Sequence, residues 1–98
     1  MTFTLKKLTI AQAEARSAAR WYEQQRPKLG LAFLDSLDKT MTSILANPMR
    51  DGIRFGNVRR APISRFSVYG VYYYIEEQDI VIIAIFHGRR DPEKLMRR

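Results

Sequence analysis

Two neighbouring segments in the C-terminal third of the chain are apolar on both of the faces that a β-strand presents. They cover residues 66–75 and 80–86. A strand with one face in solvent alternates apolar and polar residues, whereas a strand covered on both faces reads as a continuous apolar run. A chain of 98 residues has little material with which to cover a sheet twice. We therefore expect its own helices to cover one face and a second chain to cover the other.

Size and composition indicate one folded domain spanning residues 1–98. The hydrophobic fraction of 46% is that of a folded protein and argues against disorder. With no cysteine, the chain forms no disulfide and no thiolate metal site. The longest apolar run, 80–86, is too short to span a bilayer, and no long apolar segment follows the first residues as in a signal peptide. We expect a cytoplasmic protein without membrane contact, cofactor or metal.

The charge balance predicts an acidic partner. Seventeen Lys and Arg against ten Asp and Glu give a net charge of +7, with a pI near 10.1. Such a balance suits nucleic acid, an acidic protein or an anionic surface, and does not distinguish among them. The second half of the chain carries nine arginines and one lysine. Arginine is the residue of bidentate carboxylate or phosphate recognition.

Hydrophobic periodicity predicts an α+β domain of order β-α-α-β-β-β. A helical hairpin packs on one face of a small, mainly antiparallel sheet, and a short C-terminal helix is possible after Pro92. Thr9 and Gln12 have the spacing of a capping box, and Pro27 and Pro48 end the two helices. The segment 49–57 reads as a loop. The expected elements are strand 2–8, a helix from 9 to just before Pro27, a helix from 29 or 30 to 46, and strands 58–63, 66–75 and 80–86.

Several short motifs, in order and with fitting spacing from about Ala11 to Pro92, resemble the RelE/ParE toxins of bacterial type II toxin–antitoxin systems, and ParE-like toxins most closely. Ser67 departs from the family, which usually has proline after the phenylalanine. The motifs are Ala19-Arg20-Trp21-Tyr22-Glu23-Gln24-Gln25, Leu29-Gly30-Leu31-Ala32-Phe33-Leu34, Asn47-Pro48, Val58-Arg59-Arg60, Arg65-Phe66-Ser67-Val68-Tyr69-Gly70-Val71-Tyr72-Tyr73 and Phe86-His87-Gly88-Arg89-Arg90-Asp91-Pro92.

The resemblance implies a small toxin with a RelE/ParE-like fold that a cognate ParD-like antitoxin neutralises in a hetero-oligomer. ParE-like members are understood to poison DNA gyrase by protein–protein contact, and RelE-like members to cleave messenger RNA on the ribosome. The antitoxin of a ParE-like toxin typically wraps the toxin with its C-terminal segment. This agrees with the apolar strands, which indicate a covering partner independently.

A nuclease of the RelE type would need a base, cations and an acid. His87, the only histidine, could be the base, and Arg65 and Arg89 could stabilise the developing charge. RelE-like nucleases usually place a tyrosine or a second histidine near the C-terminus, and residues 88–98 contain neither. His87 is therefore more simply a residue that caps the end of the sheet. The missing acid favours gyrase poisoning over RNA cleavage.

The residues expected to contact the antitoxin or the target are mainly arginines and aromatics near the strands. Alternation separates Arg59 from Arg60 across the sheet, and it separates Tyr72 and Tyr74 from Tyr69 and Tyr73. One tyrosine pair must be core, and the other is available to a partner. Tyr22 is expected in the core, and the place of Trp21 is left open. The full candidate set is Arg59, Arg60, Arg65, Tyr73, His87, Arg89 and Arg90.

Three functions therefore stay open from the sequence. The first is a ParE-like toxin that inhibits DNA gyrase without chemistry of its own. The second is a ribosome-dependent, metal-independent endoribonuclease that acts on messenger RNA. The third is a non-toxic basic module retained for antitoxin binding.

Overall fold

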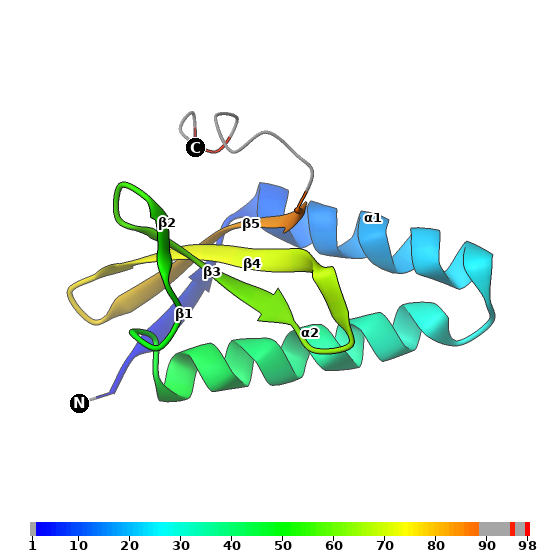
Figure 1. Ribbon diagram of the computed structural model, residues 1–98, viewed down its shortest axis with the longest axis horizontal. Coiled ribbons are helices and arrows are strands. Elements are labelled where there is room, and N and C mark those ends of the chain that lie inside the picture. The colour runs from blue at the N-terminus through cyan, green and yellow to red at the C-terminus, as the bar shows by residue number, and fades with distance from the viewer. Residues whose placement is uncertain (1, 89–94, 96–97) are drawn as a thin grey trace.

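The computed structural model describes residues 2–88, 95 and 98 (Figure 1). It confirms the α+β class, with one strand before the two helices, four strands after them, and thus one more strand than expected. The elements are β1 (Thr4–Lys7), α1 (Thr9–Gln25), α2 (Leu29–Ala46), β2 (Ile53–Phe55), β3 (Val58–Ile63), β4 (Phe66–Glu76) and β5 (Asp79–His87). The possible C-terminal helix falls largely on residues outside the described ones.

The strands form one mixed sheet in the order β1-β5-β4-β3-β2. Only β1 pairs in parallel, alongside the first half of β5; the other pairs are antiparallel. The two apolar segments form a hairpin, β4–β5, as their sequence predicts. A bulge at Ile83 interrupts this hairpin, because Tyr72 pairs with Ala84 while Tyr73 pairs with Ile82. Neighbouring residues Ile83 and Ala84 therefore both belong to the same buried cluster.

The prediction of a loop over 49–57 is wrong at its centre, where Ile53–Phe55 pairs with β3 as the edge strand β2. Glycines on both sides, Gly52 and Gly56, gave the segment the composition of a turn. A strand of three residues is also too short to display a period-two pattern. Its pairing is decided by contact with β3 rather than by its own propensity.

The helical hairpin is fastened at its turn by a side chain of α1. The Glu23 carboxylate accepts hydrogen bonds from the backbone N–H of Lys28 (3.0 Å) and of Gly30 (3.0 Å). These two N–H groups belong to the start of α2, which has no intrahelical partner for them. A Cβ at Gly30 would lie 2.6 Å from the Ala19 carbonyl oxygen. Glycine is therefore required here for the close approach of the two helices.

Helix α1 begins without the capping box that the sequence suggested. Leu8 is the N-cap, no side chain caps the helix, and Thr9 already lies within it. The backbone N–H of Leu8 instead donates to the Ile82 carbonyl at 3.0 Å, which continues the pairing of β1 with β5. The position of the strand thus fixes where the helix starts. Helix α1 ends at Gln25, shortly before Pro27, as predicted.

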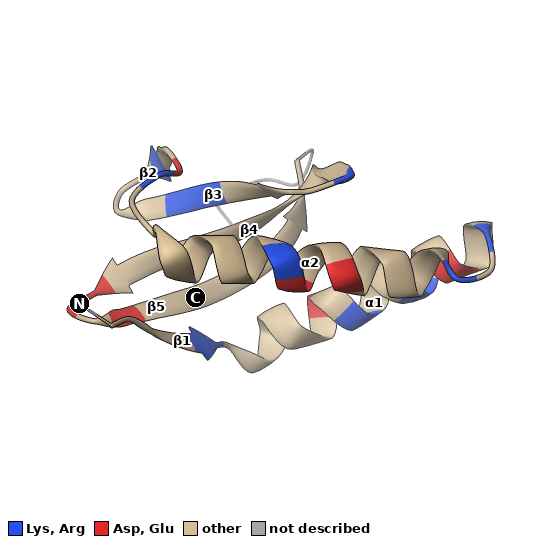
Figure 2. Cartoon of the chain, turned by 90° about the horizontal axis from the view of Figure 1, so that it is seen from below, with Lys and Arg blue, Asp and Glu red and all other residues tan. Residues whose placement is uncertain are grey.

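The main core lies between the helical hairpin and one face of the sheet, here called the helix face (Figure 2). Small residues of α1 (Ala11, Ala15 and Ala18) let α2 and β5 approach closely. Tyr22 joins this core as predicted, stacked on Phe33 with ring centroids 5.2 Å apart. The fully buried side chains of this core include Phe33 and Ile44 of α2 and, on the helix face of the sheet, Ile63, Val71, Tyr73 and Ile80.

The opposite face of the sheet, here called the tail face, is also buried within the single chain. The apolar residues clustered on it are at most a tenth exposed, so the expectation that a second chain must cover it is wrong. The C-terminal part of the chain supplies cover, since Leu95 is 2% exposed and belongs to this cluster. The cluster comprises Val58, Tyr72, Val81, Ile83, Ala84, Phe86 and Leu95.

Candidate interaction surface

Two of the residues expected to contact a partner are structural. Tyr73 is fully buried on the helix face, and its hydroxyl donates to the Pro48 carbonyl (2.7 Å) and to Asp51 Oδ2 (3.0 Å). Burial and the Asp51 carboxylate together raise the pKa of Tyr73 well above its usual range. Arg59 donates from Nη1 to the carbonyl of Asp51 at 2.6 Å. Tyr73 and Arg59 therefore hold the segment after α2 against the sheet, and we leave Tyr73 out of the candidate site.

Arg60 lies across the sheet from Arg59, as strand alternation predicts. Its guanidinium lies 5.8 Å from the centre of the Tyr72 ring, on the tail face. Nη2 donates to the carbonyls of Ser67 (3.2 Å) and Val68 (3.4 Å). A Cβ at Gly70 would lie 2.4 Å from Arg60 Nε, so a glycine in the middle of β4 leaves the space that the arginine fills. Arg60 is a cation held in one position.

A basic hollow of about 260 Å³ surrounds Arg60 at the end of the hairpin. Arg54, an exposed residue of β2, adds a second guanidinium to this hollow. Figure 2 shows basic segments on the neighbouring strands β2 and β3. None of the described residues that line it is acidic. They are Arg54, Arg60, Ser67, Val68, Tyr72, His87 and Gly88.

An aromatic hollow of about 350 Å³ adjoins the basic one and shares Val68 and His87 with it. Trp21 is 52% exposed and Val68 is 51% exposed, which is high for such large apolar side chains. The His87 ring lies edge-on to Tyr69 with centroids 5.3 Å apart. The pKa of Tyr22 is raised above its usual value, mainly by burial and to a lesser extent by the nearby Tyr69. The lining residues are Trp21, Tyr22, Val68, Tyr69 and His87.

The three residues suggested for RNA cleavage do not form one described site. His87 lines both hollows, whereas Arg65 belongs to the β3–β4 turn, with its guanidinium 5.4 Å from the Phe66 ring centre. Arg65 has a left-handed backbone with φ of 70°. It is not among the described residues of either hollow. Arg89 and Arg90 lie outside the described residues.

The pairing of β1 with β5 ends at Ile82. Beyond it, side chains instead of a strand form hydrogen bonds with backbone groups on this edge of β5. The Ile85 N–H donates to Glu14 Oε1 (3.1 Å), and Arg98 Nη1 donates to the Ile83 carbonyl (2.9 Å). Glu14 and Arg98 are themselves paired through two hydrogen bonds of 2.9 and 2.8 Å. The Arg98 guanidinium also lies 4.8 Å from the Phe86 ring centre. This arrangement, here called the tail clasp, fastens the chain end to α1 and β5.

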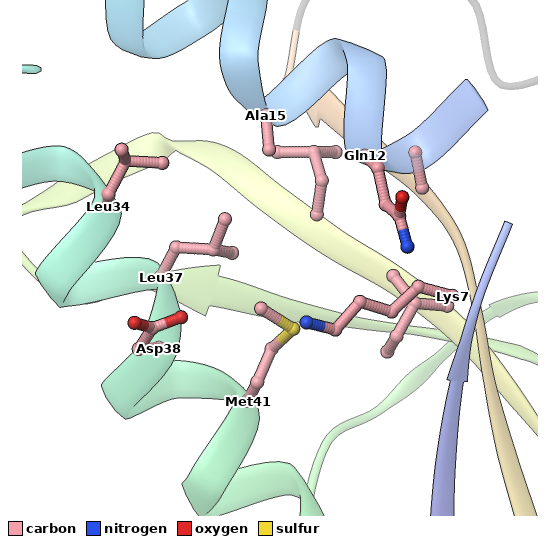
Figure 3. Close-up of a pocket in the computed structure, with 10 residues that line it drawn as sticks. Lys7, Gln12, Ala15, Leu34, Leu37, Asp38 and Met41 are labelled. Carbon is pink, nitrogen blue, oxygen red and sulfur yellow. The ribbon is translucent and has the colours of Figure 1, made fainter. Parts of the chain in front are cut away.

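A third hollow of about 160 Å³ opens between α1, α2 and the β1 edge (Figure 3). Ala15, Leu34, Leu37 and Met41 give it an apolar floor, while Lys7, Gln12 and Asp38 supply polar groups. Figure 3 shows the Lys7 side chain extending across the opening towards Met41. The hollow lies at the strand that forms one edge of the sheet. It is therefore a shallow apolar cleft beside an unpaired strand edge.

The described residues offer little for metal-dependent chemistry. Among residues 2–88, 95 and 98, no group of three His, Cys, Asp or Glu side chains could hold a metal ion. Within the same described part of the chain, no helix is long and apolar enough to cross a membrane. The two hollows around His87 instead combine the fixed cation Arg60 and the exposed cation Arg54 with the exposed ring of Trp21. Such surfaces bind anionic or aromatic partners.

Sequence reasoning missed Arg54, Glu14 and Arg98 and left Trp21 undecided. Gly70 was a usable signal for the packing of Arg60, because a glycine inside a strand indicates the close approach of another group. Glu14 carries no comparable signal, since an acidic residue on an amphipathic helix is usually solvated. Its pairing with Arg98 joins two residues far apart in the sequence, and no local pattern predicts such a contact.

Comparison with known proteins agrees with this fold and size. A family model described as the ParE toxin of the type II toxin–antitoxin system parDE matches residues 8–92. No curated protein matches the sequence. The fold is similar to a solved chain described as the chromosomal ParDE toxin–antitoxin system from P. aeruginosa, with a TM-score of 0.77 and 14% identity over 88% of this chain and 96% of that one. Since the family match covers most of its length, the chain belongs to the ParE toxin family of type II toxin–antitoxin systems.

Proposed function

We propose that this ParE-family toxin is neutralised by a cognate ParD-like antitoxin in a hetero-oligomer and inhibits DNA gyrase in the cytoplasm by protein–protein contact. The family match over residues 8–92 carries this proposal. A toxin of this kind needs a contact surface and no catalytic centre of its own. The exposed Trp21 and the fixed cation Arg60 are side chains typical of energetically important protein contacts.

The arrangement around His87 supports contact over RNA cleavage. A metal-independent nuclease needs a base and an acid beside the same phosphate. Of the two described residues suggested for this chemistry, His87 lines the hollows and Arg65 lies on a separate turn. Arg60, Arg65 and His87 therefore stay candidates for contact with the target or the antitoxin.

The positive charge suits an antitoxin with an acidic neutralising segment. The chain carries a net charge of +7, and opposite charge on a partner accelerates association and selects the correct partner. An open reading frame next to this one, encoding a short protein with an acidic and amphipathic C-terminal half, is the expected companion. Co-expression of the two should yield a stable complex on size-exclusion chromatography.

Expression of the chain without its antitoxin tests the proposed target. We expect growth arrest, DNA breaks and an SOS response, with messenger RNA intact. Cut transcripts with intact DNA would support the endoribonuclease instead, and normal growth would support the non-toxic module. Two matched variants sharpen the result. His87→Gln removes a base but keeps a polar side chain that can still make contacts, so RNA cleavage should be lost whereas gyrase poisoning should at most be weakened. Arg65→Gln keeps the base and removes a charge from a separate turn, so any loss of toxicity in this variant reports on contact.

A further inference from the structure

We propose that the basic and aromatic hollows around His87 together bind single-stranded nucleic acid, with a phosphate on Arg54 and Arg60 and a base against Trp21. This goes beyond the proposed function, which concerns contact with a protein. It would hold whichever macromolecule the toxin inhibits. It concerns binding and requires no bond to be broken.

The phosphate position is defined by the way Arg60 is held. Its Nη2 is fixed by the carbonyls of Ser67 and Val68, and its side chain fills the space above Gly70. A guanidinium has five N–H donors, so these contacts leave several for a ligand. Because the group is already positioned, little conformational entropy is lost when an anion binds. Arginine in a fixed position matches the geometry of a phosphate.

Arg54 makes the same hollow suited to an anion. It is exposed on β2 and lines the hollow together with Arg60. The described lining residues include no carboxylate that would neutralise the pair. Because none of the described lining residues supplies an acid, an anion that enters the hollow would reduce the repulsion between these two cations. The neutral Ser67 also lines the hollow, and hydroxyl groups are common phosphate ligands in nucleic-acid complexes.

The aromatic hollow distinguishes nucleic acid from other anions. Trp21 presents half of its surface to solvent and meets Tyr22 edge-on at 5.1 Å, so the pair forms a corner. Tyr69 and His87 complete the lining on the other side. Single-strand-binding proteins combine such rings, on which bases stack, with cations that follow the backbone. An acidic peptide would satisfy the two arginines but bring no planar group for the rings.

The arrangement of the two hollows fits a single strand better than a duplex. They adjoin through Val68 and His87, so one strand could place its phosphate in one and its base in the other. In a duplex the bases are stacked and paired, and their faces are not available to Trp21. We therefore expect an unpaired strand to bind more tightly than the same sequence in a hairpin.

The test measures binding of a fluorescein-labelled oligothymidylate of about 12 nucleotides to the full chain, a length within the site sizes of single-strand-binding domains. Anisotropy gives the affinity. Trp21, the only tryptophan, gives a second signal from within the site. We expect saturable binding with quenching of Trp21 fluorescence. A hairpin duplex and a polyglutamate peptide of equal charge should bind about tenfold more weakly, because neither offers free bases for stacking.

Five variants separate the site from general charge. Arg54→Gln alters an exposed side chain, so it leaves the core intact, and it should weaken binding several-fold. Arg60→Gln should do the same, and each should lower the dependence of log K on log salt by about 0.7, the value for a single phosphate neutralised on an unpaired strand. Trp21→Ala should weaken binding about tenfold, and Trp21→Phe should restore part of the affinity. Arg65→Gln removes the same charge from the β3–β4 turn and should change the affinity little.

Each alternative outcome would overturn the proposal. Equal losses of affinity in Arg54→Gln and Arg65→Gln would mean that binding follows net charge alone. Polyglutamate that binds as tightly as the oligonucleotide would assign the hollow to an acidic peptide. Binding without any change in Trp21 fluorescence would place the strand elsewhere on the molecule.

Discussion

The two faces of the sheet are equally buried, but they are covered in different ways. On the helix face, α1 and α2 of 17 and 18 residues pack against strand side chains such as Ile63 and Val71, which have no exposed surface. On the tail face, the described cover is Leu95 and Arg98. The first contact repeats along two long helices, whereas the described part of the second is made by two residues near the chain end.

This difference teaches that a doubly apolar strand does not by itself require a partner chain. From the sequence, Val81 and Ile83 were expected on a face that a second chain must cover. In the structure they are only 9% and 4% exposed within this chain. The helix face gains from many cooperative contacts, so its disruption would unfold the protein. The described cover of the tail face, Leu95 and Arg98, lies near the end of the chain, and chain ends open at lower free energy than the core. We therefore expect the two faces to differ in how cooperatively they unfold, and mutations on each face can test this difference.

The largest expected effect comes from matched leucines on the two faces. Leu37 and Leu95 are 3% and 2% exposed and lose the same atoms on mutation to alanine. Leu37→Ala should lower the free energy of unfolding by about 3 kcal/mol or more, and Leu95→Ala by about 2 kcal/mol or less, because the end of the chain can settle into the space. Urea denaturation followed by circular dichroism measures both. Equal decreases would show that the tail face is as cooperative as the helix face.

A smaller effect is expected from the tail clasp. The side chains of Glu14 and Arg98 are each 13% exposed and share two hydrogen bonds. Glu14→Gln also weakens the acceptor for the Ile85 N–H, so it should cost about 1–3 kcal/mol. A double-mutant cycle with Arg98→Gln should give a coupling energy of about 1 kcal/mol or more, as for groups in one hydrogen-bond network. A coupling near zero would mean that the chain end is held without the clasp.

Tyr73 provides a test of the helix face that depends on pH. Tyr73→Phe leaves the Asp51 carboxylate and the Pro48 carbonyl without their donor and should cost about 1–2 kcal/mol at neutral pH. Burial, then Asp51, raises the pKa of Tyr73 in the folded state above the unfolded value of about 10. Above pH 10 the unfolded chain therefore loses this proton while the folded chain keeps it. The contribution of Tyr73 to the stability of the fold is therefore complete below pH 10. Above pH 10 it falls, by at most about 1.4 kcal/mol per pH unit.

The control for this titration is the variant itself. Tyr73→Phe should show a shallower decrease in stability above pH 10 than the wild type, in unfolding experiments from pH 8 to 11. Tyr22, whose pKa is also raised, accounts for part of the slope that stays. If the two proteins lose stability in parallel, the Tyr73 hydroxyl is not protected by the fold as its contacts indicate.

The elements of the fold could be predicted because each carries a periodic local signal. Helices α1 and α2 show apolar stripes at helical spacing, and Pro27 and Pro48 follow their ends. The strands β4 and β5 read as apolar runs separated by a short polar turn. Strand alternation also placed Tyr72 and Tyr73 on opposite faces, as observed. Strand β2 escaped because three residues are too few for a pattern.

The candidate surface was harder to predict because it depends on contacts between single residues distant in sequence. The hollows bring Trp21 of α1 next to His87 of β5. The clasp joins Glu14 to Arg98, and Gly70 makes room for Arg60. None of these pairs repeats along the chain, so neither periodicity nor composition indicates them. Residue type alone suggested Arg60 and His87, but it equally suggested Tyr73, which the core conceals.

The smallest expected effect concerns an ion pair at the other end of β5. Lys6 Nζ lies 3.0 Å from Asp79 Oδ2, and the two side chains are 61% and 38% exposed. The Asp79 carboxylate raises the pKa of Lys6, yet solvent screens so exposed a pair and the flexible lysine loses entropy in forming it. Lys6→Gln should leave the melting temperature unchanged within error, in low and in high salt, whereas Arg98→Gln should lower it in both. A decrease for Lys6→Gln equal to that for Arg98→Gln would show that burial does not set the strength of these two ion pairs, and would remove the distinction between the clasp and an ordinary surface contact.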